Sequence, residues 1–173
     1  MATMTSDLAA GEEEIGRWLA AARETVASIS HCWLATRGLG GGANARTVRI
    51  SPGASGGDEW TRRFLCRRGS RKVAEMRNDP GVTLAYQTDT GNAYVALAGR
   101  ACLVDDLTEM RSLWPAASDK LFPAGFADAN MMVVRVDVDR IEIHVRGVTR
   151  EPFGYGRTLV EREPNMRWRF VPA

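Results

Sequence analysis

Residues 44–72 are the most informative stretch of the chain and read NARTVRISPGASGGDEWTRRFLCRRGSRK. This pattern predicts two strands, 46–50 and 60–66, followed by the triplet Ser70-Arg71-Lys72 at the start of a helix. The N-terminus of a helix attracts phosphate, because it presents unpaired N–H groups and the positive end of the helix dipole. A hydroxyl, a guanidinium and an ammonium at that place predict a site for one terminal phosphomonoester. Ordinary solvated surface charge is the alternative interpretation.

The bulk composition is that of a globular protein with a single domain. The chain has 173 residues, of which 45% are hydrophobic and 25% are charged, and this length is enough to bury a core. Basic and acidic residues number 23 and 21, and a net charge of +2 argues against general nucleic-acid binding. No apolar run approaches the ~20 residues that span a bilayer. We therefore expect one domain over residues 1–173, with neither nucleic acid nor membrane as a partner.

Cysteine and histidine usage predicts the compartment and argues against a metal centre. Cys32, Cys66 and Cys102 are widely spaced, odd in number and without a CxxC pair. Since the first residues also lack a charged-then-apolar leader pattern, these cysteines indicate reduced thiols in a cytoplasmic protein. Only His31 and His144 could offer imidazole ligands, so no metal site is expected.

The rest of the pattern predicts many strands and few helices. Helices are expected over 12–28, within an N-terminal segment 1–29, over 70–77, and after a cap at Asp105 or Asp106, the last with Leu107, Met110, Leu113 and Trp114 on one face. Strands are expected at 31–37, 46–50, 60–66, 82–86, 93–104, from residue 131 onward, 158–163 and 167–171. Strands and helices do not alternate regularly. The fold class is therefore predicted as mainly β, an antiparallel barrel with peripheral helices.

The strand that begins at Met131 changes its alternation midway. Apolar residues occupy even positions from Met132 to Val138, and odd positions from Ile141 to Val145. A shift of one residue exchanges the two faces of a strand. A bulge or tight jog is therefore predicted between Val138 and Arg140.

An ordered series of short motifs resembles the FMN-binding split-barrel family of pyridoxamine 5′-phosphate oxidases, in particular its general stress protein group. Each motif alone would recur by chance, but their order along most of the chain is specific. The motifs are Arg46-Thr47-Val48, Phe64-Leu65-Cys66, Ser70-Arg71-Lys72, VAEMRNDPGV (73–82), Ala93-Tyr94-Val95, Gly99-Arg100-Ala101, Leu113-Trp114-Pro115 and LFPAG (121–125).

The resemblance implies an FMN site shared by the two subunits of a homodimer. Arg46, Thr47 and Val48 would line the flavin ring and ribityl chain, with backbone groups meeting the polar edge of the ring. Phe64 and Leu65 would pass beneath the cofactor, and Ser70, Arg71 and Lys72 would hold its phosphate. Tyr94 matches a glutamine that the oxidases contribute from the second subunit, and Trp114 matches a tryptophan of the stress-protein group.

The chain departs from the oxidases near its C-terminal end. His144 stands where they carry a tryptophan, and Arg157 matches a later FMN-contacting arginine only across a gap. Arg150 matches the first residue of an arginine–histidine pair that closes the substrate site, but Pro152 replaces the histidine. Oxidation of pyridoxamine 5′-phosphate itself is therefore not expected.

Two functions remain open from the sequence. The first is a homodimeric, FMN-dependent oxidoreductase whose catalytic residues and substrate are unknown. The second is a barrel that binds a cofactor without turnover: it would store or sense FMN, or hold a deazaflavin or a haem, with His144 as axial ligand.

Overall fold

The computed structural model describes residues 2–51, 58–90, 92–115, 118, 122–150 and 158–172, with no account of side chains before Gly11. The chain forms two compact units. Unit 1 comprises Met1–Ile29, Ala85–Leu97 and Asp139–Ala173, and unit 2 comprises Ser30–Leu84 and Ala98–Val138. No described helix is both long enough and apolar enough to cross a membrane.

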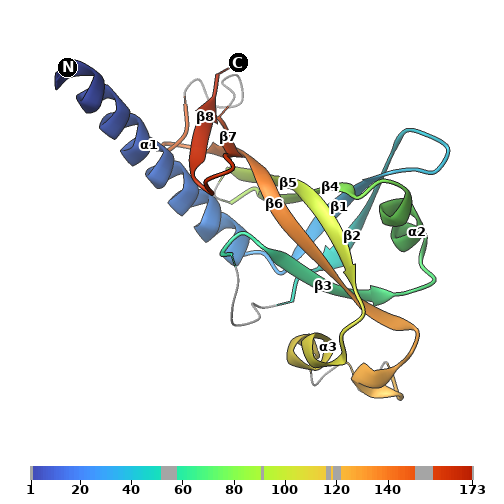
Figure 1. Ribbon diagram of the computed structural model, residues 1–173. Helices are drawn as coiled ribbons and strands as arrows, with labels where there is room; N and C mark the ends of the chain where they lie inside the picture. Colours follow the sequence, from blue (N-terminus) through green and yellow to red (C-terminus); the bar gives the residue numbers. More distant parts are fainter. Residues whose placement is uncertain are drawn as a thin grey trace. The chain divides into compact units, whose positions relative to one another are not determined.

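The described residues form three α-helices, one short 3-10 helix and eight strands (Figure 1). The helices are α1 (Ala2–Ala27), α2 (Arg71–Asn78), α3 (Leu107–Leu113) and η2 (Gly125–Ala127). The strands are β1 (His31–Arg37), β2 (Ala43–Arg49), β3 (Arg62–Arg67), β4 (Gly81–Thr88), β5 (Ala93–Val104), β6 (Met131–Val145), β7 (Leu159–Arg162) and β8 (Trp168–Val171).

The strands join in one sheet in the order β2-β1-β4-β5-β6-β7-β8, and β3 also pairs with β6. β1 and β2 form an antiparallel hairpin closed by the glycine-rich turn, in which Gly41 and Gly42 have positive φ values of 88° and 70°. Glycine adopts such values without the steric cost that a Cβ brings. The predicted closing hairpin is confirmed as β7 and β8, which pair antiparallel.

Unit 2 is built on the alternation of its strands and on one short helix. In β1, Cys32, Leu34 and Thr36 are buried while the residues between them face outward or lie half-buried. β3 runs antiparallel to β6, and the ring of Phe64 is fully buried. α2 packs on this core through Val73 and Met76.

Unit 1 holds the N-terminal helix beside the closing hairpin. Trp18 of α1 is buried, and its ring centroid lies 5.5 Å from that of Phe170 on β8. The guanidinium carbon of Arg150 lies 4.1 Å from the Phe170 centroid and 5.6 Å from that of Trp18. Arg150 therefore stacks on two aromatic rings of this unit, a cation–π arrangement that helps to hold the helix on the hairpin.

The predicted change of face in β6 is confirmed. Asp139 and Arg140 are both exposed, and the buried positions that follow are Ile141 and Ile143. β5 approaches β6 closely at the same level, since a Cβ placed on Gly99 would lie 2.1 Å from the carbonyl oxygen of Asp137. Only glycine fits such a close approach of two backbones.

Two predictions need correction. The first helix begins at Ala2 rather than at Glu12, because residues such as alanine, leucine and methionine favour helix even without an apolar stripe. Leu107 does not share the buried face of α3, since 58% of the residue is exposed. It is the first residue after the N-cap Asp106, at the end of the helix that precedes the buried Met110 and Leu113. The predicted loop 51–58 lies mostly outside the described residues.

Candidate functional site

A cavity of about 330 Å³ lies within unit 2. This volume is in the range of small-molecule sites. Its lining comes from β2, β3, α2, the start of β6 and the segment that follows α3. The residues are Thr47, Val48, Arg49, Ser51, Leu65, Cys66, Arg67, Lys72, Trp114, Pro115, Ser118, Phe122 and Met131.

The charge of this lining is one-sided. Arg49, Arg67 and Lys72 border the cavity, and no described lining residue is a carboxylate or a histidine. None of these three cations forms an ion pair with a described residue. The cavity therefore favours an anionic ligand.

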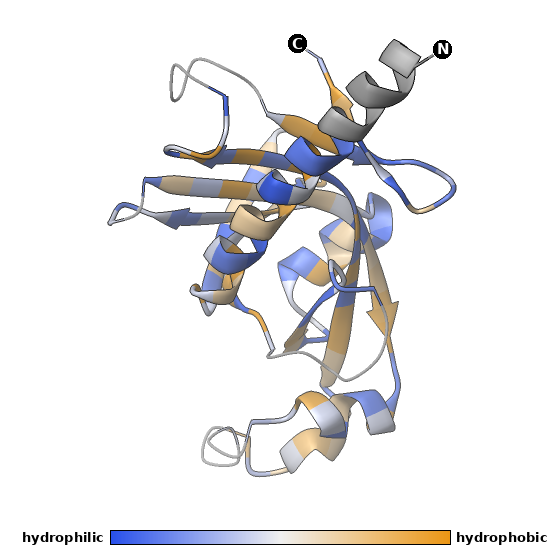
Figure 2. Ribbon diagram, turned by 90° about the vertical axis from the view of Figure 1, so that its left-hand side faces the viewer, coloured by the Kyte–Doolittle hydropathy of each residue, from blue (hydrophilic) through white to orange (hydrophobic). Residues whose placement is uncertain are grey.

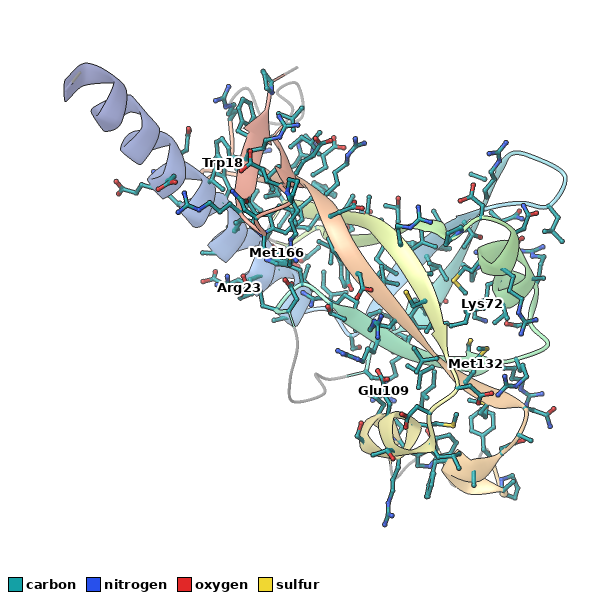
Figure 3. The ribbon with its side chains drawn as sticks, in the orientation of Figure 1. Trp18, Arg23, Lys72, Glu109, Met132 and Met166 are labelled. Carbon is teal, nitrogen blue, oxygen red and sulfur yellow. The ribbon has the colours of Figure 1, made fainter. Side chains whose placement is uncertain are left out.

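The start of α2 supplies the strongest single sign of a missing ligand. Ser70 is the N-cap residue, but its side chain makes no capping hydrogen bond. Its Oγ atom is buried and has no hydrogen-bond partner among the described residues. The first N–H groups of a helix also lack partners within the helix, and no acidic residue lies in the first turn. An anion that accepts hydrogen bonds would satisfy these groups, while Lys72 adds a positive charge at the cavity (Figure 3).

The buried carboxylate of Glu75, on α2 one turn after its first residue, was not predicted from the sequence as part of the site. Glu75 is 1% exposed. Its Oε2 accepts from Thr36 Oγ1 at 2.6 Å and from Arg46 Nη2 at 2.7 Å, and its Oε1 accepts from Asn44 Nδ2 at 2.6 Å. Arg46 Nη1 also donates to Thr36 Oγ1.

This cluster determines the charge state of Glu75. Burial raises the pKa of the carboxyl, but the hydrogen bonds from Thr36, Asn44 and Arg46 and the charge of Arg46 outweigh it. The pKa therefore lies below its ordinary value, so Glu75 is ionised at neutral pH. The sequence signal was spacing: Glu75 follows Arg71 by four residues, and Arg71 Nε lies 3.4 Å from Glu75 Oε1.

The other wall of the cavity is apolar. Met110 and Leu113 of α3 pack with Met131 and Val133 of β6, and Leu65, Val104, Trp114, Phe122 and Phe126 pack against this cluster. In Figure 2 the part of the chain that holds α3 and η2 carries several hydrophobic residues. The rings of Trp114 and Phe122 meet edge-on, with centroids 5.7 Å apart, and Arg67 lies 5.6 Å from the Phe122 ring. This wall can receive a flat aromatic group.

Two ion pairs join the α3 region to β3 and the residue that follows it. Arg63 Nε lies 2.7 Å from Glu109 Oε1, with 16% and 21% of the two side chains exposed. Arg68 Nη2 lies 2.7 Å from Asp105 Oδ1. The hydrogen bond from Arg68, together with its charge, holds the pKa of Asp105 below its ordinary value. Asp106 caps α3 by accepting from the N–H groups of Thr108 and Glu109, as the sequence predicted.

Cys66 lies at the cavity but carries an unreactive thiol. Burial raises its pKa from 9.0 to about 11, although the charges of Lys72 and Arg68 act in the opposite direction. At neutral pH the thiol is therefore protonated, and a thiol is a poor nucleophile. None of the described lining residues is a carboxylate or a histidine, the side chains whose ordinary pKa suits acid or base work near neutral pH.

The structure brings together part of the predicted site set. Five of the twelve predicted residues line the cavity: Thr47, Val48, Leu65, Lys72 and Trp114. Ser70 and Arg71 precede Lys72 in the chain, and 67% of the Arg71 side chain is exposed. The Arg46 side chain binds Glu75 and Thr36, and the Phe64 ring lies in the core.

The remaining predicted residues lie in unit 1 or outside the described residues. Tyr94 is half-buried in β5, and His144 of β6 has its Nε2 3.3 Å from Glu142 Oε1. Arg157 and Pro152 fall in 151–157, which the structure does not describe. Arg150, which matched a substrate arginine, stacks on Phe170 and Trp18.

A family model described as "Pyridoxamine 5'-phosphate oxidase like" matches residues 19–146, which is most of the chain. No curated protein matches.

Solved structures show the same fold at low sequence identity. The chain is similar to a protein related to general stress protein 26 of Bacillus subtilis, from Clostridium acetobutylicum, with 17% identity, a TM-score of 0.62, and 71% of this chain and 84% of that chain covered. It is similar to a pyridoxamine 5′-phosphate oxidase-related, FMN binding protein from Nostoc punctiforme, with 16% identity, a TM-score of 0.63, and coverages of 90% and 95%. It is also similar to a heme binding protein from Mycobacterium smegmatis, with 20% identity, a TM-score of 0.57, and coverages of 71% and 52%. The predicted fold class, an antiparallel split β-barrel with peripheral helices, is confirmed.

Proposed function

Since this chain belongs to the pyridoxamine 5′-phosphate oxidase-like family, we propose that it binds FMN in the cavity of unit 2 and acts as an FMN-dependent oxidoreductase. The phosphate would meet Ser70, Arg71 and Lys72 at the start of α2. The flavin ring would lie along Thr47 and Val48 of β2, against Leu65 and Trp114. When bound, FMN supplies the redox chemistry, and the chain binds it, orients it and excludes water.

The observation that carries this proposal is the unsatisfied chemistry at the start of α2. The buried Ser70 Oγ lacks a partner among the described residues, and the neighbouring Lys72 borders the cavity without a described carboxylate partner. A buried hydroxyl without a hydrogen bond costs about 1–3 kcal/mol. A phosphate oxygen would satisfy it, and the dianion would balance the cations that line the cavity.

The proposal includes a homodimer in which the partner covers the cavity. Trp33 pairs with Thr47 across the β1–β2 hairpin, so their side chains lie on one face of it. Thr47 lines the cavity, and 54% of Trp33 is exposed. A second copy that closed over Thr47 would also bury Trp33. A dimeric mass by light scattering at micromolar concentration is expected, and a monomer would contradict this part of the proposal.

The test of FMN binding is direct. The purified protein, stripped of bound small molecules, is titrated with FMN while flavin fluorescence is followed. Quenching that saturates at one FMN per chain is expected, together with a shifted flavin absorbance spectrum. If FMN at tens of micromolar gives neither, the proposed function is wrong. Reduction of the bound flavin by NADH or NADPH then separates an oxidoreductase from a flavin carrier.

A carrier is the second candidate, and the lining of the cavity favours it. No described lining residue is a carboxylate or a histidine, and burial raises the pKa of the Cys66 thiol to about 11. Storage or sensing of FMN needs no such group. A deazaflavin would use the same anion site. A haem would instead need His144 as the axial ligand of its iron, and the Nε2 atom of His144 lies 3.3 Å from Glu142 Oε1. A Soret band that disappears in His144→Ala would identify haem.

A further inference from the structure

We propose that Glu75 is a positioning residue: it holds β2 and the start of α2 in the arrangement that binds the anionic cofactor. This inference rests on the proposed FMN function. Glu75 is not one of the residues that line the cavity, so it would not contact the cofactor directly. Its effect on binding must therefore pass through the residues that it holds.

The contacts of Glu75 join three elements at one carboxylate. Thr36 donates from β1, Asn44 and Arg46 donate from β2, and Glu75 itself belongs to α2. The donor–acceptor distances are 2.6, 2.6 and 2.7 Å, which is short for hydrogen bonds and typical of those made to a charged group. Since Thr36 both donates to Glu75 and accepts from Arg46, the cluster has one well-defined geometry.

Both sides of the anion site depend on this cluster. On β2, Arg46 directly precedes Thr47, Val48 and Arg49, which line the cavity. On α2, Glu75 lies one turn after Arg71 and Lys72. A helix of only eight residues is marginal on its own, so its position is determined by what it packs against. Its three buried residues are Val73, Met76 and Glu75, and of these Glu75 alone can make directional bonds.

The cluster also changes the role of Arg46. Both terminal nitrogens of its guanidinium are engaged, by Thr36 and by Glu75, and its side chain does not line the cavity. Arg46 therefore acts on the cofactor through the backbone of its strand. A backbone role agrees with the family resemblance, which implies that backbone groups of this strand meet the polar edge of the flavin ring.

The sign of one substitution separates positioning from simple electrostatics. Glu75→Gln removes a negative charge near a site for an anion. If charge alone mattered, FMN would bind more tightly, because like-charge repulsion falls. If Glu75 positions the site, FMN should bind about tenfold more weakly, a change of ~1.4 kcal/mol, although the variant is more positive.

A double-mutant cycle tests whether Arg46 and Glu75 act as one unit. FMN dissociation constants are measured by fluorescence for wild type, Glu75→Gln, Arg46→Gln and the double variant, each shown by circular dichroism to be folded. Positioning predicts that both single variants weaken binding to a similar degree and that the double variant is no weaker than either. Glu161→Gln is the matched control, because Glu161 also pairs with two arginines, Arg140 and Arg169, but belongs to unit 1. It should leave FMN binding unchanged.

Amide hydrogen exchange on the ligand-free protein gives an independent readout. Glu75→Gln should speed exchange in β2 and at the start of α2 together, and Glu161→Gln should change neither. If Glu75→Gln fails to fold, Thr36→Val replaces it. This variant keeps the charge pair but removes the shared hydroxyl, and it should weaken FMN binding about threefold, because the cluster loses a net hydrogen bond.

The outcomes distinguish this inference from the proposed function. A wild-type protein that binds no FMN overturns the proposed function and, with it, the site that Glu75 would position. If wild type binds FMN while Glu75→Gln binds equally well or more tightly, only the role of Glu75 is overturned. If Arg46→Gln weakens binding but Glu75→Gln does not, Arg46 contacts the cofactor directly.

Discussion

The two walls of the cavity, the α2 wall (α2 with β2) and the α3 wall (α3 with its apolar cluster), are held in place by different means. Behind the lining of each wall lies an arginine–glutamate pair with a 2.7 Å contact. In the α2 wall, Glu75 is 1% exposed and Arg46 19% exposed, and further hydrogen bonds surround the carboxylate. In the α3 wall, Glu109 and Arg63 retain 21% and 16% exposure, and an apolar cluster does most of the packing. The two contacts are equally short, but the stability of the fold should depend more on the Arg46–Glu75 pair. A buried carboxylate has no water to replace a lost partner, whereas a partly exposed one does.

The largest expected effect comes from removing each carboxylate. Glu75→Ala should lower the free energy of unfolding by about 3 kcal/mol, the lower end for a broken buried pair because Arg46 keeps some contact with water. Glu109→Ala should cost about 1 kcal/mol, as for a partly exposed pair. Urea unfolding followed by circular dichroism measures both. Equal losses for the two variants would show that the walls do not differ in this way.

The second prediction concerns ligand selectivity. Lys72→Ala should weaken FMN binding roughly ten- to hundredfold, the typical effect of losing one charge-assisted contact, but should leave riboflavin binding nearly unchanged because riboflavin has no phosphate. Arg71→Ala should act in the same direction but less strongly, since its side chain is 67% exposed and already contacts Glu75.

Trp114→Ala is the matched variant on the apolar wall. It removes ring contact and should weaken FMN and riboflavin by a similar factor, about tenfold. Titrating both ligands into each variant gives the ratios directly. If the ratio of FMN affinity to riboflavin affinity in Lys72→Ala stays at the wild-type value, the FMN phosphate does not bind at the start of α2.

How much the sequence could predict also differs between these walls. The start of α2 was predictable, because a turn precedes Ser70-Arg71-Lys72 and the N-cap residue Ser70 belongs to the local sequence. The change of face in β6 was predictable as well, because the apolar residues move from even positions up to Val138 to odd positions from Ile141. Glu75 was not predicted, because its partners Thr36 and Asn44 lie 39 and 31 residues away in sequence. Only the fold brings these partners together.

Arg150 is a second residue whose contacts, with residues far away in the sequence, could not be predicted from the sequence. The family resemblance matched it to a substrate arginine, and the structure adds that within unit 1 it stacks on Phe170 of β8 and on Trp18 of α1. No periodicity reveals such a contact, since it depends on how the N-terminal helix packs. Leu107 shows that even a regular apolar spacing fails in a helix of seven residues, since 58% of this first residue is exposed.

The third prediction concerns how the stability contributed by Glu75 depends on pH. The folded-state pKa of Glu75 lies below its ordinary value of 4.5, so its ionised form stabilises the folded protein. That contribution is complete above pH ~4.5 and is lost as the pH falls through the folded-state pKa, because the unfolded chain takes up the proton first. The difference in unfolding free energy between wild type and Glu75→Gln should therefore shrink as the pH falls below ~4.5. Urea unfolding at several pH values from 7 to 3 measures it, and a difference independent of pH would contradict it.

The smallest expected effect links Cys66, which borders the cavity, to Lys72 on α2. Burial raises the pKa of Cys66 to about 11, and the positive charge of Lys72 opposes part of that rise. Lys72→Ala should therefore raise the Cys66 pKa further, because the thiolate loses a nearby cation. In a Cys32→Ser/Cys102→Ser background, the rate of alkylation against pH reports this single thiol. Arg68→Gln is the control, since Arg68 acts on Cys66 in the same direction and its loss should also raise the pKa. FMN phosphate bound at Lys72 would neutralise the same charge, so adding FMN to the Cys32→Ser/Cys102→Ser protein should slow alkylation. When Lys72→Ala is added to that background, any remaining slowing would report only the covering of the thiol by the ligand.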